Sequence, residues 1–166
     1  CALDLDDLLA FGEGQHLIVM EDDAGAAPPP ALLDAFKDRI WLAATALYGP
    51  RPRARLYGRI EMAQRLGLPL IAVNDAHMHV AARRPLADAL TCIREKTTLI
   101  EAGFLIAANA ERHLKSAQEM ARLFVDAPQA VDESARFIDA LDFRLTDLSY
   151  EYPSELREGY ASEQEA

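Results

Sequence analysis

The sequence predicts an α/β fold in its first half, followed by a helical segment. Two observations support this prediction. Through residue 73, short apolar runs alternate with amphipathic stretches and brief turns, and such alternation favours parallel strands covered by helices. Beyond residue 84 the pattern is mostly helical. At 166 residues the chain is long enough for one domain with a sizeable core.

Glycine and proline mark the expected ends of the first elements. Gly12 and Gly14 stop a first helix, and an acidic turn rich in glycine and proline closes the strand after it. Pro30 suits the first turn of a helix, and Gly49-Pro50 breaks the second strand. In chain order we expect a helix at 4–10, a strand at 16–20, a helix at 30–37, a strand at 39–47, a helix at 53–66 and a strand at 68–73.

The helix expected at 53–66 shows the clearest hydrophobic period. Its apolar residues recur at spacings of three and four, which places them on one face. Gly67 suits the C-terminal cap of this helix. The residues of the apolar face are Leu56, Ile60, Ala63 and Leu66.

The second half is expected to be helical around a polar connector at 109–115. Ser116 and Glu119 match a capping box, in which each side chain satisfies a free amide of the other residue. We expect helices at 85–94, 116–125 and 129–140, the last with Ala130, Phe137, Ile138 and Leu141 on its apolar side, then an extended segment at 148–153 and an acidic tail from Ser154.

The charge balance limits what this segment can bind. Its net charge of −10 argues against a main nucleic-acid grip, because neutralising phosphates requires a Lys/Arg face. The acids crowd residues 4–38 and 126–165, whereas residues 51–96 are locally basic. That basic middle is compatible with a phosphorylated ligand.

Cysteine content and hydropathy indicate a cytoplasmic protein. Cys1 and Cys92 have no metal-type spacing, so we expect no disulfide framework. No apolar run approaches the roughly 20 residues that span a bilayer, and no signal segment is present, so no membrane partner is expected. Because the chain opens at Cys1 rather than Met, we expect it to be a piece of a longer protein.

A carboxylate and two imidazoles follow the strand expected at 68–73. Asp75, His77 and His79 occupy alternate positions, and alternate residues of an extended segment point the same way. Ligands in α/β proteins bind at this end of a strand, and these side chains suit Zn²⁺, Mn²⁺ or Fe²⁺. The competing interpretation is a turn capped by Asp75 with exposed histidines. His79 is the weakest of the three candidates.

Other polar residues are weaker candidates. Arg83 and Arg84 could bind phosphate, although an exposed basic turn is the simpler interpretation. We expect His16 and His113 to be structural and Cys92 to be a small core residue. Serine-nucleophile, Walker and dinucleotide motifs do not occur in the sequence, so those chemistries lack support.

Several segments in a fixed order carry a resemblance to a known family. They are Leu5–Leu9, Asn74–His79, Arg83–Arg94, Asn109–Ser116, Glu119–Phe124 and Tyr150–Pro153. Together they resemble the bacterial error-prone DNA polymerases of the C family, relatives of the replicative polymerase III α subunit. By this resemblance, residues 1–108 are the later part of a PHP (polymerase and histidinol phosphatase) domain, an incomplete, distorted (β/α)7 barrel. Residues 109–166 are then a helical connector toward the palm domain.

The resemblance implies a parent nucleotidyltransferase that performs translesion synthesis in DNA repair and damage-tolerant replication. Its partners would be DNA, dNTPs and accessory translesion proteins, and Mg²⁺ in the palm domain would support the reaction. The palm carboxylates would lie beyond Ala166. We therefore expect no polymerase catalytic residue in this segment and no activity from the segment alone.

The resemblance also implies a degenerate metal site. In the family, an Asp-x-His pair after a late strand binds metal, and this pair maps onto Asp75 and His77. The strand Trp41–Leu47 departs from the family pattern, because metal-competent relatives often carry Glu or His there, whereas Thr45 and Leu47 stand at the matching positions. We expect Zn or Mn to be held weakly, if it is held, in a domain that acts mainly as scaffold.

Two other functions stay open at this point. In a free-standing PHP-type metal-dependent phosphoesterase, Asp75 and His77 would serve a hydrolytic metal cluster and the two arginines would contact the substrate phosphate. A plain α/β interaction module would hold no metal and would have no polymerase context.

Overall fold

Three short parallel strands form the sheet on which most of the chain packs. The computed structural model describes residues 4–21, 25–48 and 51–149. The strands are β1 (Leu17–Val19), β2 (Ile40–Thr45) and β3 (Leu70–Val73), in the spatial order β1-β2-β3. Both pairs are parallel, with Leu17 opposite Ile40 and Leu42 opposite Leu70. A helix lies in each connection, as parallel neighbours require.

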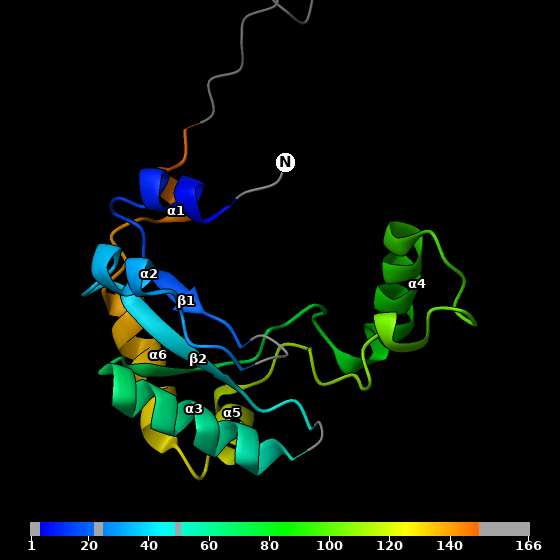
Figure 1. Cartoon of the computed structure of the whole chain (residues 1–166). Helices are drawn as coiled ribbons and strands as arrows, with labels where there is room; N and C mark the ends of the chain where they lie inside the picture. The colour runs from blue at the N-terminus through cyan, green and yellow to red at the C-terminus, as the bar shows by residue number, and fades with distance from the viewer. Residues whose placement is uncertain (1–3, 22–24, 49–50, 150–166) are drawn as a thin grey trace, which may run out of the picture.

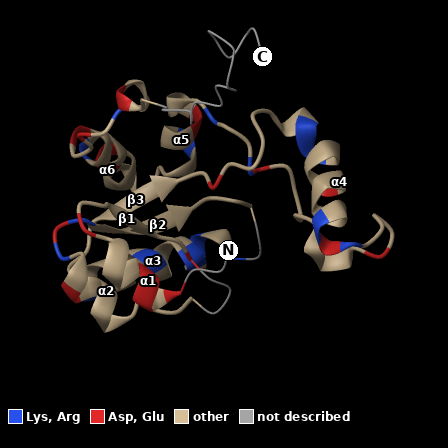
Figure 2. Cartoon of the chain, turned by 90° about the horizontal axis from the view of Figure 1, so that it is seen from above, with Lys and Arg blue, Asp and Glu red and all other residues tan. Residues whose placement is uncertain are grey.

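Helices cover both faces of the sheet (Figures 1 and 2). One side carries α1 (Leu5–Phe11), α2 (Pro30–Ala35) and α3 (Pro52–Leu66), and the other carries α5 (Ala117–Leu123) and α6 (Pro128–Asp139). The helix α4 (Arg84–Glu95) stands apart from both layers in these two views. Short 3₁₀ turns lie at Ala81–Arg83, Gly103–Leu105 and Leu145–Asp147.

The central strand β2 is buried on both faces, and its side chains alternate between the two helical layers. Leu42 is fully buried and packs with Met62 of α3. Trp41 points to the opposite layer, where its ring meets Phe137 of α6 edge-on at 5.0 Å between centroids. The core therefore lies on both sides of β2, and the ends of the strands lie at the edge of the core.

Gly12 has a second role besides ending α1. A Cβ atom at this position would lie 2.3 Å from Cζ of Phe36, a residue at the end of α2. The glycine lets the chain after α1 approach the Phe36 ring closely.

The predicted elements are found near their expected positions, with two differences in detail. The Ser116 hydroxyl accepts from the backbone N of Glu119 at 3.2 Å, but the Glu119 carboxylate accepts from Arg122 instead of closing the capping box. Ile138 and Leu141, expected on the apolar side of the last helix, are 65% and 42% exposed, and Leu141 lies beyond the end of α6. Only part of the apolar face assigned to that helix is therefore in contact with the sheet.

Some sequence expectations cannot be compared with this structure. The break at Gly49-Pro50, residues 22–24 of the acidic turn, most of the extended segment at 148–153 and the tail from Ser154 lie outside the described residues. Within the described part the sheet has three strands, so a closed PHP barrel is not confirmed. No helix among the described residues is long and apolar enough to cross a membrane.

A buried arginine ties α3 to the sheet. Arg59 is only 3% exposed. Its Nε donates to the carbonyl oxygen of Ala43 in β2 at 2.8 Å, and its Nη2 donates to that of Val19, the last residue of β1, at 2.9 Å. The basic middle at 51–96 thus contributes this guanidinium to the interior and not to the surface.

Replacing Arg59 with Met should destabilise the fold. The substitution keeps an apolar stem but removes the donor to the carbonyl oxygen of Ala43, in a buried hydrogen bond, and the donor to that of Val19, in a partly buried one. The loss costs about 1–3 kcal/mol. Urea unfolding of the 166-residue chain, followed by fluorescence of its single tryptophan, Trp41, would measure the change. Arg65→Met, at an exposed position of the same helix, is the matched control. Equal midpoints for the two variants would contradict the assigned role.

Candidate functional site

The candidate site begins where β3 ends. Asp75 has a backbone φ of 47°, in the left-handed region that Asp tolerates better than most residues. The chain bends again at His77 and His79. The extended conformation assumed from the sequence is therefore not present, and the argument that alternate side chains point the same way does not apply here.

Asp75 and His77 nevertheless come together. The Nε2 atom of His77 lies 3.7 Å from Oδ1 of Asp75. The other carboxylate oxygen, Oδ2, accepts a hydrogen bond from Nη2 of Arg112. His79 is exposed and lines a cavity of about 290 Å³ together with His77, Arg83 and side chains of α4. The structure thus brings together two of the three predicted ligands, Asp75 and His77, and pairs Asp75 with the guanidinium of Arg112.

The described residues do not fit a metal by themselves. Asp75 and His77 supply two donors, and among residues 4–21, 25–48 and 51–149 no group of three or more His, Cys, Asp or Glu side chains could hold an ion. The positive charge next to Asp75 comes from Arg112. Zn or Mn at this position stays a prediction that requires additional ligands and the displacement of Arg112.

The connector at 109–115 joins the end of β3 through backbone and side-chain hydrogen bonds. The backbone nitrogens of His77 and Met78 both donate to the carbonyl oxygen of Arg112, at 2.8 and 3.1 Å, and that of Leu114 donates to Met78 at 3.0 Å. Asn74 donates from Nδ2 to the carbonyl oxygen of His113. These bonds make a short parallel bridge that fixes Arg112 beside Asp75.

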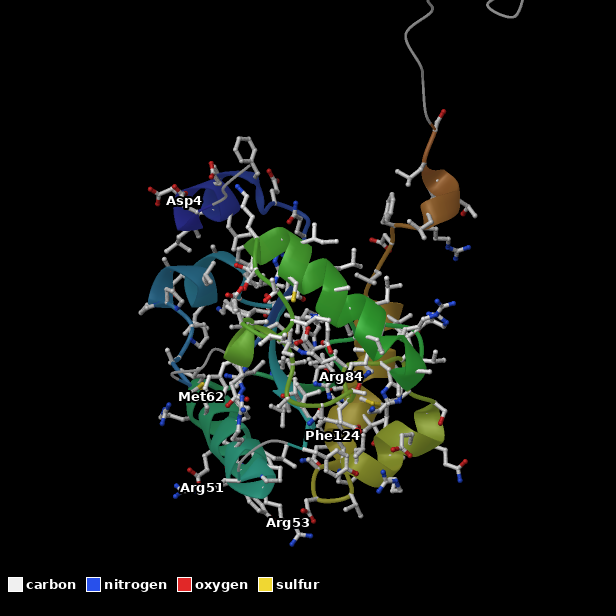
Figure 3. The ribbon with its side chains drawn as sticks, turned by 90° about the vertical axis from the view of Figure 1, so that its right-hand side faces the viewer. Asp4, Arg51, Arg53, Met62, Arg84 and Phe124 are labelled. Carbon is white, nitrogen blue, oxygen red and sulfur yellow. The ribbon has the colours of Figure 1, made fainter. Side chains whose placement is uncertain are left out.

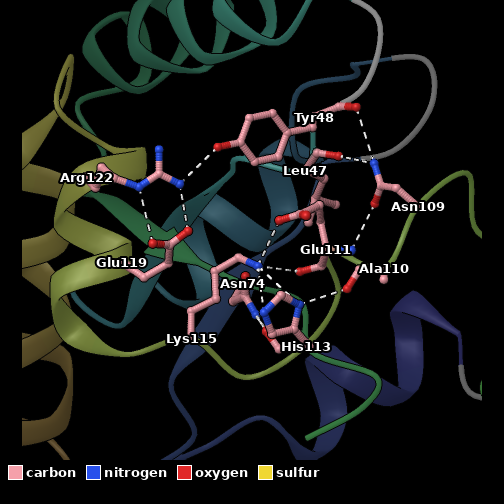
Figure 4. A network of polar contacts seen from close by, with 10 residues as sticks. All are labelled: Leu47, Tyr48, Asn74, Asn109, Ala110, Glu111, His113, Lys115, Glu119 and Arg122. Carbon is pink, nitrogen blue, oxygen red and sulfur yellow. Dashed lines mark hydrogen bonds and ion pairs between the residues drawn. The ribbon is translucent and has the colours of Figure 1, made fainter. Parts of the chain in front are cut away.

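The same connector reaches the end of β2 through Asn109 (Figure 4). Its Nδ2 donates to the carbonyl oxygens of Leu47 at 2.8 Å and Tyr48 at 3.2 Å. Its Oδ1 accepts from the backbone N of Glu111 at 3.0 Å. The Asn109 side-chain amide therefore binds two carbonyl oxygens just beyond β2 and also a backbone amide within the connector.

A buried lysine stabilises the connector from inside. Lys115 has a side chain only 1% exposed, and its Nζ contacts both the carboxylate and the carbonyl oxygen of Glu111 at 2.9 Å. His113 lies beside it, with Nδ1 2.8 Å from the carbonyl oxygen of Ala110. His113 is thus bound within the connector, in agreement with the structural role expected for it.

A second polar cluster lies between the end of β2 and α5 (Figure 4). Arg122 donates from Nη2 to the Tyr48 hydroxyl at 3.1 Å and to Oε1 of Glu119 at 2.7 Å. The hydrogen bond from Arg122 lowers the pKa of the Glu119 carboxyl from its ordinary value, and the same bond raises the pKa of Arg122. Charge in this cluster is therefore already balanced.

A cavity of about 220 Å³ adjoins this cluster at the carboxyl end of β2. Two arginines line it, Arg53 and Arg122. Arg53 points away from the body of the molecule at the start of α3 (Figure 3) and pairs with Asp126 at 3.4 Å. An anion in this cavity would have to compete with two existing carboxylate partners.

The two arginines predicted to contact phosphate have different surroundings. Arg84 donates from Nη2 to the carbonyl oxygen of Ala107 at 2.6 Å, and its Nε lies 3.3 Å from Asp88. Arg83 is exposed at the end of a 3₁₀ turn. The guanidinium of Arg84 holds α4 to the following loop, and phosphate binding by either residue stays a prediction.

The remaining histidine and cysteine candidates are structural. His16 stacks on Trp41 with 5.4 Å between ring centroids. Cys92 is a free, buried thiol in α4.

Sequence reasoning missed Arg112, which was included only as part of a polar connector. Its opposite charge to Asp75 was the available signal, but no local pattern links positions 37 residues apart.

The fold and the site define an α/β protein with its polar residues gathered at the carboxyl ends of parallel strands. No protein-family model matches the chain. Individual relatives do match. They are proteins named error-prone DNA polymerase from Mesorhizobium japonicum (46% identical, 92% of this chain, 14% of that protein), Bradyrhizobium sp. (43%, 93% and 14%) and Caulobacter vibrioides (37%, 93% and 15%).

These matches confirm the resemblance inferred from the ordered motifs. The chain is homologous to one segment of bacterial error-prone DNA polymerases, and it spans about 14% of the length of the curated relatives it matches.

Asn109→Ala should loosen the contact between the connector and β2. It removes the donors to two carbonyl oxygens, so we expect a loss of about 1–2 kcal/mol of unfolding free energy and faster amide hydrogen exchange across 109–115. Gln64→Ala, an amide deletion at an exposed position of α3, is the control. Unchanged exchange in the Asn109 variant would contradict the assignment.

Arg112→Met should strengthen metal binding at Asp75. Removing a partly exposed counter-charge changes the affinity by about 1 kcal/mol, or roughly fivefold, in a Zn²⁺ titration against a chromogenic chelator. Arg65→Met removes an exposed guanidinium of α3 and should change nothing. The gain should vanish when Asp75→Asn is added, and a gain that persists would show that the ion binds elsewhere.

Proposed function

We propose that this chain is a structural segment of an error-prone, translesion DNA-directed DNA polymerase that acts in DNA repair and damage-tolerant replication. The observation that carries the proposal is the identity of 37–46% over more than nine-tenths of the chain to proteins with that name. The ordered motifs found in the sequence support the same parent. The activity of the whole protein is part of the proposal, because the chain spans a small share of its relatives.

Within that parent, residues 1–108 would belong to a PHP-type barrel that serves mainly as scaffold. The parallel strands, each joined to the next through a helix, support an α/β barrel, whereas helices on both faces of the sheet are typical of an open layered sheet and weigh against a closed one. The engagement of Asp75 by Arg112 supports a scaffold role, since the carboxylate already has a cationic partner. Residues 109–166 would lead toward the palm domain.

The partners of the parent would be bound mainly by other segments. A net charge of −10 argues against this chain being the main DNA-binding segment. DNA, dNTPs and accessory translesion proteins would therefore contact the parent elsewhere, and Mg²⁺ in the palm domain would support nucleotidyl transfer. The expected compartment is the cytoplasm.

One observation favours a second candidate, a PHP-type metal-dependent phosphoesterase. Asp75 and His77 lie within 3.7 Å at the carboxyl end of a parallel strand, which is where such chemistry is built. The missing third ligand among the described residues weighs against it.

The two functions can be separated in the full-length protein that carries this chain. We expect Mg²⁺-dependent extension of a primer across an abasic template site, and extension by Asp75→Asn and His77→Ala within about twofold of wild type, because scaffold residues do not touch the reacting atoms. Absence of extension by the wild-type protein would contradict the polymerase. Hydrolysis of a phosphomonoester with Zn²⁺ or Mn²⁺, abolished by Asp75→Asn, would support the phosphoesterase instead.

A further inference from the structure

One cavity beside the end of β3 combines an apolar wall with a cationic rim. Its volume is about 290 Å³, and it lies between α4 and the chain that follows β3. Among the described residues no carboxylate lines it, whereas Asp126 and Asp88 line the cavities of about 220 and 210 Å³. Its apolar lining residues are Met78, Leu86, Ala87 and Leu90, and its polar ones are His77, His79 and Arg83.

This lining predicts the chemistry of the group that fits the cavity. Leu86 and Leu90 are 51% and 58% exposed, so their apolar surface is open to an occupant. Arg83 is exposed at the end of a 3₁₀ turn, and its guanidinium favours a negative charge beside that occupant. An apolar side chain with a carboxylate close to it therefore suits the cavity.

The loop after α4 carries such a pair of side chains. Phe104, in the turn Gly103–Leu105, is fully exposed. Glu101 lies three residues earlier and is also exposed, and its carboxylate accepts a hydrogen bond from the Thr98 hydroxyl at 2.9 Å. Phe104 borders the cavity of about 210 Å³, but its full exposure means that its ring fills no cavity of its own chain.

The exposed apolar area of α4 and this loop is that of a dimer interface. We call the large exposed apolar residues of these two elements the α4 surface; they are Leu86, Leu90, Ile93, Leu99, Ile100, Phe104 and Leu105. Their exposed fractions amount to about five fully exposed residues, or roughly 750–1,000 Å² at roughly 150–200 Å² for each. A stable dimer buries roughly 800 Å² on each partner.

We propose that the α4 surface binds a second copy of this chain in an isologous dimer. Phe104 of each copy enters the cavity of about 290 Å³ on the other copy, and Glu101 of each copy pairs with Arg83 of the other. This inference goes beyond the proposed function, which gives the segment a scaffold role within one polypeptide.

The observation that favours a second copy is that one end of the chain carries both the cavity and the side chains that fit it. In a two-fold contact each such pair is made twice, and an aromatic anchor in an apolar pocket is the typical centre of an interface. The helix α4 stands off from both helical layers (Figures 1 and 2). A second copy can therefore reach it without meeting the sheet.

Sedimentation velocity of the full-length protein that carries this chain tests the dimer. Over roughly 1–100 µM, the range in which a contact of this size associates, we expect a monomer–dimer equilibrium. Phe104→Ala should raise the dissociation constant of the dimer about tenfold or more, because it removes the central anchor. The matched control is Phe11→Ala in α1, where the phenylalanine is 76% exposed and the dissociation constant should not change.

Exchanging the two charges tests the predicted pairing. Arg83→Glu and Glu101→Arg should each raise the dissociation constant about fivefold, because each places like charges opposite one another. The double variant should return it to within about twofold of wild type. Such a recovery would also show that neither single variant had lost the dimer through misfolding.

Three results would overturn the proposal. A protein that stays monomeric up to about 100 µM would show that the α4 surface is not a dimer interface and would point to its coverage within one polypeptide. A dimer that Phe104→Ala leaves unchanged would place the contact elsewhere. Losses that add up in the charge-exchanged double variant would reject the pairing of Glu101 with Arg83 and with it this dimer.

Discussion

The carbonyl oxygens at the carboxyl ends of a short parallel sheet need donors, and much of this structure is arranged to supply them. Side chains from three different segments do so. Arg59 of α3 donates to the last residue of β1 and to Ala43 within β2. Asn109 donates beyond the end of β2, and the Ser134 hydroxyl of α6 donates to the carbonyl oxygen of Ala72 in β3 at 3.3 Å. These hydrogen bonds connect α3, the connector and α6 to the strands.

The same constraint explains why polar residues at this edge do not by themselves make an active site. A strand end in an α/β protein gathers carboxylates, amides and guanidinium groups whether or not it binds a ligand. Here Asp75 pairs with Arg112, and the Arg122 guanidinium pairs with Glu119. Each charge is matched from within the chain, which is the state expected of a scaffold. A hydrolytic site would instead leave a carboxylate free for an ion.

Sequence patterns within a few residues predicted the positions of individual helices. The spacing of apolar residues placed α3 within one residue of its observed start, and the proline at the first turn located α2. The burial of Arg59, the left-handed backbone at Asp75 and the pairing of Asp75 with Arg112 could not be foreseen. Each depends on groups far apart in sequence, such as the 40 residues between Arg59 and Val19. Ordered motifs predicted the family because they sum information over the whole chain.

The helix α4 shows where prediction from local pattern and observed packing diverge. Its hydrophobic period predicts a buried side, and the helix forms at the expected residues, yet Leu90 and Ile93 are more than half exposed. The hydrophobic period predicts where such a helix forms, whereas its position depends on the surface that its apolar side meets. The exposed apolar side of α4 therefore follows from where the helix lies, and not from whether the helix forms.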